Sequence, residues 1–305
     1  MVPEERIRTL LEAPLRPDGD YVLYWMTAFR RTRSNFSLDR ALEYCRELDR
    51  PLLIFEPLRV GYEWASDRIH RFVIDGMADN FAATERAGVT YFPWVERREG
   101  EGKGLLAAFA ERAAVVIADD YPAFFLPRMV AAAAKQLDGV RLEAVDSNGL
   151  YPLRATDKTF NRAVDFRRHL QKSLAPHLGE RPAIDPLAEY DLGAAPIPSA
   201  VSEGWTRAND ELLSGKDDLS EYPIDHAVTV AKGLPGGQRA AYERLQGFID
   251  ERLSGYGEGR NHPDDDSASG LSPYLHFGHI STHQIFEALV RREDWNPSRL
   301  GTTAR

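Results

Sequence analysis

Short apolar runs alternate with helical patterns over the first half of the chain. The apolar runs are rich in β-branched and aromatic residues, and they cover Tyr21 to Met26, Pro51 to Phe55, Val89 to Val95, Ala114 to Ala118 and Val140 to Val145. Such runs are typical of strands that are buried on both faces of a parallel sheet. The helical patterns between them cover Leu38 to Leu48, Ser66 to Ala87, Gly104 to Ala113 and Pro127 to Leu137. Strands that alternate with helices predict a doubly wound, Rossmann-like α/β domain over residues 1–150.

This predicted domain carries no recognisable nucleotide motif. The chain continues after the first strand as TAFRR, without the glycines that let a pyrophosphate approach the backbone. The run GEGKG at residues 100–104 has no Ser or Thr after its lysine, so it does not match a phosphate-binding loop. We therefore expect the sheet to act as a scaffold whose ligand no motif identifies.

The alternation ends near Ser147, and the rest of the chain divides into two further parts. Residues 151–200 begin with an amphipathic helix over Phe160 to Leu174 and continue through a proline-rich segment. Because proline at this density blocks helices, we predict an interdomain helix followed by an extended linker. From residue 201 to 305 only helical patterns recur, notably Gly237 to Leu253 and Thr282 to Arg292. This third part is predicted to be a helical domain.

One stretch of the helical domain suggests chemistry. It reads SGLSPYLHFGHIS over residues 269–281. Ser272 followed by Pro273 predicts a helix N-cap with proline at the first helical position, and Gly270 permits a tight turn just before it. Hydroxyl groups and free amides that converge at a helix N-terminus favour an anion, above all a phosphate. The alternative is two capped helices without a ligand, since a second helix begins with a capping box at Ser281 to Gln284.

Composition places the chain among ordinary globular proteins. Its residues are 43% hydrophobic and 28% charged, and no apolar run approaches the roughly 20 residues that cross a bilayer. The single cysteine, Cys45, excludes a disulfide within the chain and fits a reducing compartment, so we predict a cytoplasmic protein without a membrane partner.

The charge distribution leaves DNA binding open. A net charge of −9 argues against an indiscriminate nucleic-acid coat protein, although local fields decide binding. Basic residues form two clusters, which we interpret from charge alone as solvated surface: Arg30, Arg31 and Arg33, then Arg162, Arg167, Arg168 and Lys172.

Metal and hydrolase sites are weaker interpretations of the same stretch. His276, His279 and His283 form an H-x-x-H-x-x-x-H pattern, but Gly278 interrupts the helix that would align them. Three adjacent acids at residues 264–266 are typical of a solvated loop. Neither serine before the predicted helix lies in a G-x-S-x-G nucleophile motif. We predict no metal and no catalytic nucleophile.

The run SGLSPYLHFGHIS closely resembles the flavin-binding signature of the photolyase and cryptochrome family. The preceding GGQRAAYERLQGFIDERLSGY and RNHP resemble the same family. In the first half, YVLYWMTAFRR, WASDRIHRFVIDGMADN, VTYFPWVE and LEAVDSNGLYPLR resemble class II cyclobutane pyrimidine dimer photolyases. The resemblance covers nearly the whole chain.

This resemblance implies a set of residues that hold the phosphates and ribose of FAD. Its members contribute hydroxyls or backbone groups, and they are Tyr256, Ala268, Ser269, Gly270, Leu271 and Ser272. Ala268 stands where relatives carry a hydroxyl residue, so it offers only its amide. One lost neutral hydrogen bond costs about 1 kcal/mol.

The resemblance also implies the function. Family members use light and FAD to split cyclobutane pyrimidine dimers in UV-damaged DNA, and their α/β domain can hold a second, antenna chromophore of a type that this sequence does not specify. We expect a monomer. The alternatives are a cryptochrome-like blue-light photoreceptor and a non-catalytic α/β remnant without its flavin half.

Family members continue well beyond the length of this chain. The resemblance therefore predicts that the helical FAD-binding domain is incomplete, that Trp295 lies outside the electron-transfer path, and that the 305 residues alone bind FAD weakly and repair nothing.

Overall fold

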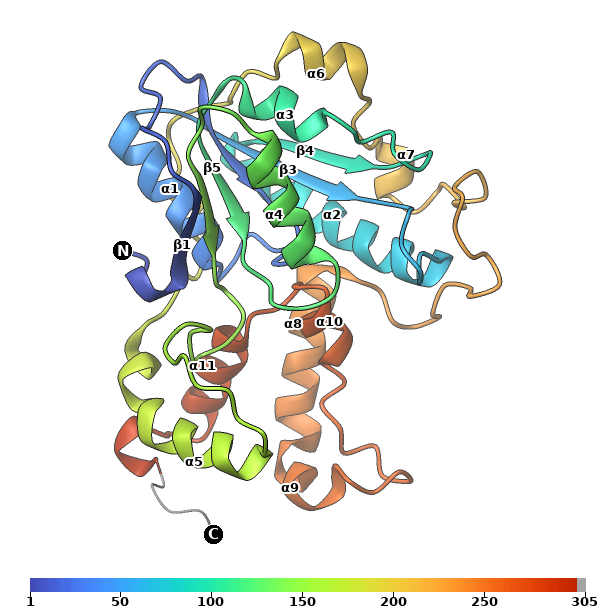
Figure 1. The fold of residues 1–305 in the computed structure, drawn as a ribbon. Helices are drawn as coiled ribbons and strands as arrows, with labels where there is room; N and C mark the ends of the chain where they lie inside the picture. Colours follow the sequence, from blue (N-terminus) through green and yellow to red (C-terminus); the bar gives the residue numbers. More distant parts are fainter. Residues whose placement is uncertain (301–305) are drawn as a thin grey trace.

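The computed structural model describes residues 1–300 and consists of an α/β part above a set of helices (Figure 1). The α/β part is built on a six-stranded sheet of order β1-β6-β5-β2-β3-β4. Its strands are β1 (Ile7–Leu11), β2 (Tyr21–Trp25), β3 (Leu52–Leu58), β4 (Thr90–Val95), β5 (Ala113–Asp119) and β6 (Leu142–Val145). Neighbouring strands from β6 through β5, β2 and β3 to β4 are parallel. The predicted α/β fold class is confirmed.

Strand β1 is the exception, and the sequence did not predict it. It pairs antiparallel with β6 at the edge of the sheet. All its residues are only half-buried, so it lacks the continuous apolar run that identifies the inner strands. The sheet is therefore mixed, with an antiparallel edge on a parallel core.

Alternate residues of the inner strands face two different cores, as expected for a sheet covered on both sides. In β2, Leu23 and Trp25 face the core under α3 (Leu105–Ala110) and α4 (Leu126–Gln136). Val22 and Tyr24 face the opposite core, under α1 (Phe36–Leu48). Helix α2 (Asp67–Ala87) packs beside β3 and β4 and ends at Gly88, which adopts a left-handed conformation. The bounds of these helices agree with the predicted patterns to within a few residues.

The second half of the chain is helical, as predicted. Its helices are α5 (Ala163–Ser173), α6 (Ser199–Gly204), α7 (Asp210–Leu213), α8 (Gly237–Gly247), α9 (Tyr256–Gly259), α10 (Ser272–His276) and α11 (Thr282–Arg292). The pattern that predicted one helix over Gly237 to Leu253 is divided, because α8 passes into a π-helical turn at Phe248–Arg252. None of the helices in residues 1–300 has both the length and the apolar character that a membrane crossing requires.

Residues just after 200 pack on the α/β part. Val201 of α6 joins the core under α3 and α4, and Leu212 and Leu213 of α7 join a core with Val73 and Met77 of α2. The division of the chain at residues 150 and 200 stays a prediction. Helices α6 and α7 therefore pack on the α/β part, although they follow residue 200.

Two adjacent arginines after β2 correct one prediction, and one of them, Arg31, bonds to the helical part. Arg30 and Arg31 are buried rather than on a solvated surface. Arg30 pairs with buried Glu56 at 2.8 Å, and Arg31 donates to the carbonyl oxygens of Gly278 and Ser147. A pattern of adjacent basic residues cannot reveal these three partners, because each lies 26 or more residues away along the chain.

Helix α8 is capped by side chains of the α/β part. Asp75 and Asp79 lie one turn apart on α2 and accept hydrogen bonds from the amides of Gly236 and Arg239, at 3.0 and 2.9 Å. Nδ1 of His279 accepts the amide of Gly237 at 2.9 Å. Carboxylates at a helix N-terminus satisfy free amides and complement the helix dipole, so this joint fixes where α8 starts.

Candidate cofactor-binding site

The turn at residues 268–272 leads into α10, and α10 packs against α8 (Figure 1). The predicted N-cap at Ser272 is wrong. Ser272 is the first helical residue, and Leu271, with φ −87° and ψ −9°, precedes it without a side-chain cap. The cause is burial of Leu271, which joins Leu245 and Phe248 in the core of the helical part. The side chain of Ser272 is exposed instead.

The polar groups of this turn are free to bind a ligand. Gly270 has φ +68°, a left-handed conformation that glycine adopts without strain. The amide of Leu271 makes only a long contact with Oγ of Ser269, at 3.4 Å. Within residues 1–300, the amides of Ser269, Gly270 and Ser272 donate to no carbonyl or side chain. Unpaired amides around a positive-φ glycine form the kind of concavity that binds anions. The turn therefore fits a phosphate.

Tyr256, the remaining predicted site residue, begins α9 below the end of α8 (Figure 1). Its half-buried ring packs edge-on against Phe248, with 5.2 Å between ring centres. Arg260 lies over the same ring, at 5.4 Å. Phe248 follows Arg244 by four residues, and Arg244 contacts the turn at Gly270. Tyr256 packs at Phe248 and the 268–272 turn lies at Arg244, so the two contact the same helical stretch at positions four residues apart.

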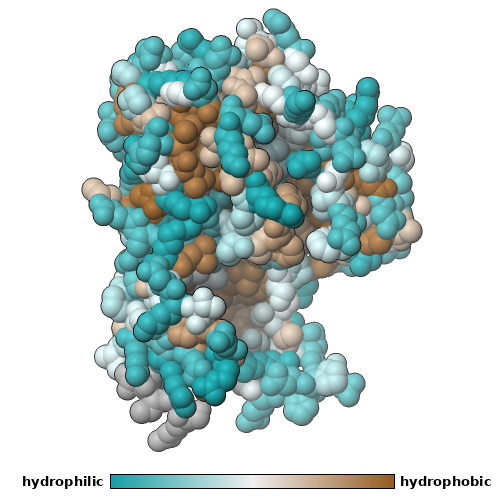
Figure 2. Space-filling view, viewed as in Figure 1, coloured by the Kyte–Doolittle hydropathy of each residue, from teal (hydrophilic) through white to brown (hydrophobic). Residues whose placement is uncertain are grey.

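A hollow lies where the helical part meets the α/β part, between α11 and α8. Figure 2 shows apolar surface, in brown, lining this hollow. Ile285 and Leu289 of α11 are only partly buried against the core that α8 contributes. An apolar hollow in the helical part suits the flat ring system of a ligand.

Three histidines that could have formed a metal site do not assemble. His279 is buried and binds the Gly237 amide, while the ring of His283 packs edge-on against Phe36 at 5.3 Å. His276 is exposed and packs against Phe124 instead. Burial lowers the pKa of His279 and of His283 to about 3, and nearby arginines add to the shift. Both rings are neutral parts of the joint.

A different group of possible metal ligands lies elsewhere. Donor atoms of Glu5, His177 and Glu180 all lie within 4.8 Å of one another, the one such group in residues 1–300. Nδ1 of His177 is 2.9 Å from Glu5 and 3.3 Å from Glu180, and Arg6 is 3.9 Å from Glu180. The histidine and its two carboxylates pair with one another and with the buried arginine, while Oε1 of Glu5 and Nε of Arg6 are buried without a hydrogen-bond partner.

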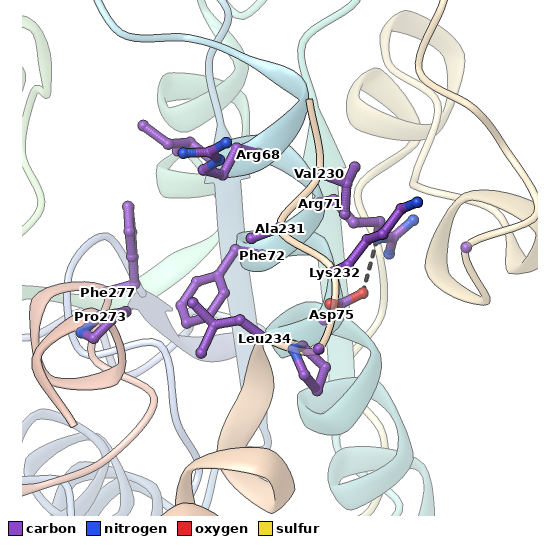
Figure 3. A pocket seen from close by; sticks show the side chains of 14 residues that line it. Arg68, Arg71, Phe72, Asp75, Val230, Ala231, Lys232, Leu234, Pro273 and Phe277 are labelled. Carbon is purple, nitrogen blue, oxygen red and sulfur yellow. Dashed lines mark hydrogen bonds and ion pairs between the residues drawn. The ribbon is translucent and has the colours of Figure 1, made fainter. Parts of the chain in front are cut away.

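A cavity of about 430 Å³ opens behind the turn, between α2, α10 and residues 230–235 (Figure 3). Phe72 and Phe277 form its apolar wall, and Arg68 and Lys232 are cations of its lining. Arg71 also lines it, but that guanidinium is engaged by Asp75 at 2.7 Å. Pro273 lines the cavity and no residue of the 268–272 turn does, so the cavity is separate from the free amides.

A second cavity, of about 510 Å³, lies at the carboxyl ends of β2, β3 and β4. Trp25, Phe55 and Trp94 line it on the sheet side, and Met129 of α4 lines it opposite. Ligands of open α/β sheets bind at this edge of the strands. The cavity includes Gly100, Gly102 and Gly104, so the GEGKG run lies at a candidate ligand site although it is not a phosphate loop.

Comparisons with known proteins agree with this architecture. No protein-family model matches the chain. The chain is 31% identical over 288 residues to a deoxyribodipyrimidine photo-lyase of Methanothermobacter thermautotrophicus, covering 92% of this chain and 58% of that protein. Among solved structures, it superposes on a class III photolyase of Agrobacterium tumefaciens with a TM-score of 0.65 and 22% identity, covering 90% of this chain and 54% of the other.

A cryptochrome of Synechocystis has a similar fold. Its TM-score is 0.67 at 17% identity, with 92% of this chain and 57% of the cryptochrome covered. The chain thus spans little more than half the length of each of these three proteins. The similarities support the photolyase and cryptochrome family and show the α/β fold.

Proposed function

We propose that this chain is part of a class II photolyase that repairs cyclobutane pyrimidine dimers in UV-damaged DNA, and that it binds the diphosphate and ribose of FAD. The observation that carries the proposal is the turn at residues 268–272, whose amides the protein leaves unpaired beside Gly270. The similarity to a photo-lyase over 92% of the chain supports the same conclusion.

The residues that would contact FAD lie on the 268–272 turn and at the start of α9, which both pack against the α8 stretch. The amides of Ala268 to Leu271 would bind the phosphates of FAD, together with the hydroxyls of Ser269 and Ser272. Tyr256 donates its phenol hydroxyl from the start of α9. The apolar hollow between α8 and α11 would offer surface to the flat rings (Figure 2).

The chemistry of repair belongs to the cofactor, and the protein orients the reactants. A reduced flavin excited by light supplies an electron that opens the dimer ring and is then returned. The damaged bases must leave the duplex to reach the flavin, which costs less for a lesion that stacks poorly.

DNA contact requires exposed positive charge, and the two basic clusters differ in this respect. In the first cluster Arg30 and Arg31 are buried and only Arg33 is exposed, whereas Arg167, Arg168 and Lys172 of α5 are all exposed. We therefore assign the DNA-facing role to α5. Replacing Arg167 and Lys172 with glutamine should weaken binding to DNA of any sequence. It should also lower the salt dependence of binding, by about one released counterion for each phosphate that the variant no longer neutralises.

The antenna chromophore, if one is used, fits the cavity at the carboxyl ends of β2, β3 and β4. Its wall of Trp25, Phe55 and Trp94 suits a flat aromatic molecule. The proposed protein is a monomer of the cytoplasm, a reducing compartment that suits its one free cysteine, Cys45.

The test has two stages. First, the 305-residue chain is titrated with FAD and flavin fluorescence is followed; we expect weak binding, because the chain contributes contacts to the diphosphate and ribose. Second, the protein with FAD is illuminated in the presence of UV-damaged DNA, and intact dimers are counted. Absence of any FAD binding contradicts the flavoprotein assignment. Binding without repair by a protein as long as the relatives favours the photoreceptor, an alternative that the cryptochrome fold supports.

A further inference from the structure

Arg244 of α8 runs directly beneath the turn at Gly270. A Cβ atom placed on Gly270 would lie 3.3 Å from Cδ of Arg244 and 3.6 Å from both Nε and Nη1. The side chain of Arg244 is half-buried. The turn therefore rests on the stem and the guanidinium of this arginine, and a larger residue at position 270 would displace it.

The charge of Arg244 is not neutralised by the protein. Arg252, further along the same helical stretch, pairs with Asp266 at 3.4 Å. Within residues 1–300, Arg244 forms no ion pair with a carboxylate. It does act on Tyr274: burial raises the pKa of that phenol, and Arg244 opposes the shift. A half-buried guanidinium without a carboxylate partner keeps its charge available to an anionic ligand.

Helix α8 holds Arg244 in a fixed position. Its first amides bind Asp75 and Asp79 of α2, so the helix cannot slide relative to the α/β part without losing these hydrogen bonds. Two turns further on, the same helix carries Arg244. A cation on an anchored helix is preorganised, so it loses little freedom when a ligand binds.

We propose that Arg244 is a direct contact for the flavin diphosphate and makes the site selective for FAD over flavins that lack a phosphate. This rests on the proposed flavin site. The free amides of the turn and the guanidinium beneath it form one anion site with a positive charge that the amides alone do not supply. Arginine suits this role because its planar donors can bind two phosphate oxygens at once.

The test compares FAD with riboflavin, which has the same ring and no phosphate. Both are titrated by flavin fluorescence into the wild-type chain and the variants Arg244→Gln, Arg244→Lys and Arg239→Gln. Arg239 is the matched control, because it lies exposed on the same helix away from the turn. Circular dichroism and thermal unfolding check that each variant is folded.

Arg244→Gln should weaken FAD binding about tenfold and leave riboflavin binding unchanged, since one charge-assisted hydrogen bond is lost. Arg244→Lys should retain most of the affinity, and Arg239→Gln all of it. The proposal is overturned if Arg244→Gln binds FAD as the wild type does, or loses FAD and riboflavin equally. A wild-type chain that binds riboflavin and FAD with equal affinity also overturns it. Failure of the wild type to bind any flavin would instead reject the proposed function, and Arg244 with it.

Discussion

Nη1 of Arg31 lies 3.1 Å from the carbonyl oxygen of Gly278, 247 residues further along the chain. This contact joins the loop after the first parallel strand to the end of the α10 segment. Gly278 has φ +73°, and a Cβ atom at this position would overlap the backbone of the same loop. The two parts of the molecule are therefore held in register by a buried charge and a glycine without room for a side chain.

Gly278→Ala should separate this joint. The added Cβ would overlap the carbonyl oxygen of Ala28 and lie 2.7 Å from the amide nitrogen of Arg30, both of them backbone atoms that cannot move aside. We expect a loss of about 3 kcal/mol or more in the free energy of unfolding, measured by urea denaturation, together with faster proteolysis around residue 280. Gly247→Ala is the control, because nothing lies within 4 Å of its Cβ. Equal stability of the two variants would contradict this account of the joint.

Asp119→Asn should destabilise the loop after β2. One carboxylate oxygen of Asp119 accepts the amides of Thr27, Ala28 and Phe29 at 2.8, 2.7 and 2.9 Å. Both oxygens of Asp119 accept hydrogen bonds, but the side chain of asparagine has only one oxygen. Its NH₂ group would therefore face either the three backbone amides or the Tyr24 hydroxyl, and bonds that the carboxylate accepts would be lost. We expect a loss of about 2–4 kcal/mol in urea denaturation. Asp20→Asn, which removes an exposed partner of Arg112, should cost under about 1 kcal/mol. A similar small cost at both positions would show that Asp119 does not organise the loop.

The stability of the protein should fall in acid through His279. Burial lowers the pKa of His279 to about 3 from 6.5, so between these values the unfolded chain binds a proton that the folded protein does not. The free energy of unfolding therefore falls as the pH decreases from about 6.5 toward 3, by up to about 1.4 kcal/mol per pH unit for one group. Asn at this position can still accept the Gly237 amide. His279→Asn should have a shallower dependence on pH, whatever its stability at pH 8; an unchanged slope would exclude His279 as a cause.

Asp39 should act in the opposite sense. Burial raises its pKa to about 7 from 3.8, while the Ala183 amide at 2.9 Å partly opposes the shift. Between these values the folded protein holds the proton, so stability falls as the pH rises. Asp39→Asn should therefore be more stable than the wild type at pH 8 by about 1 kcal/mol, less than the full shift because the group is partly exposed, and no more stable at pH 4. Thermal unfolding at the two pH values checks this, and a gain that is the same at both would contradict it.

Asp79→Ala should loosen the start of α8. It removes the acceptor of the Arg239 amide and a negative charge at the helix N-terminus, a loss of about 1–2 kcal/mol. Asp79→Asn keeps an acceptor and should lose less. Hydrogen exchange at residues 237–240 reports the change locally, and protection that is equal in all three proteins would contradict the capping role.

The sheet could be predicted because its inner strands carry a signal of their own. Strands such as Ala113–Asp119 are buried on both faces and must be apolar throughout, and the helices between them bury one face at regular spacing. Edge strand β1 lacks this signal, because its half-buried positions hold both polar and apolar residues. The capping box at Ser281 was confirmed for a similar reason, because its hydrogen bonds join residues three positions apart.

Features that depend on distant contacts could not be predicted. Ser272 and Pro273 have the composition of a helix start, but burial of Leu271 moved the cap. Arg30 and Arg31 look like surface charges until Glu56 and Gly278 are brought beside them. Arg244 has no local pattern that marks it, because its relation to Gly270 arises only when the chain folds back across α8. The predicted FAD contacts themselves remain predictions.

The cap on α8 also sets an order of assembly. Asp75 and Asp79 of α2 accept the amides of Gly236 and Arg239, and α2 packs on the sheet, so these two amides have no partners until α2 is in place. The ribosome releases the chain in that same order, with the sheet strands emerging before α8. Synthesis from the N-terminus therefore makes α2 before α8, so the acceptors for the α8 amides can already be in place. In a circularly permuted chain that began at α8, these amides would lack their acceptors until α2 had been made.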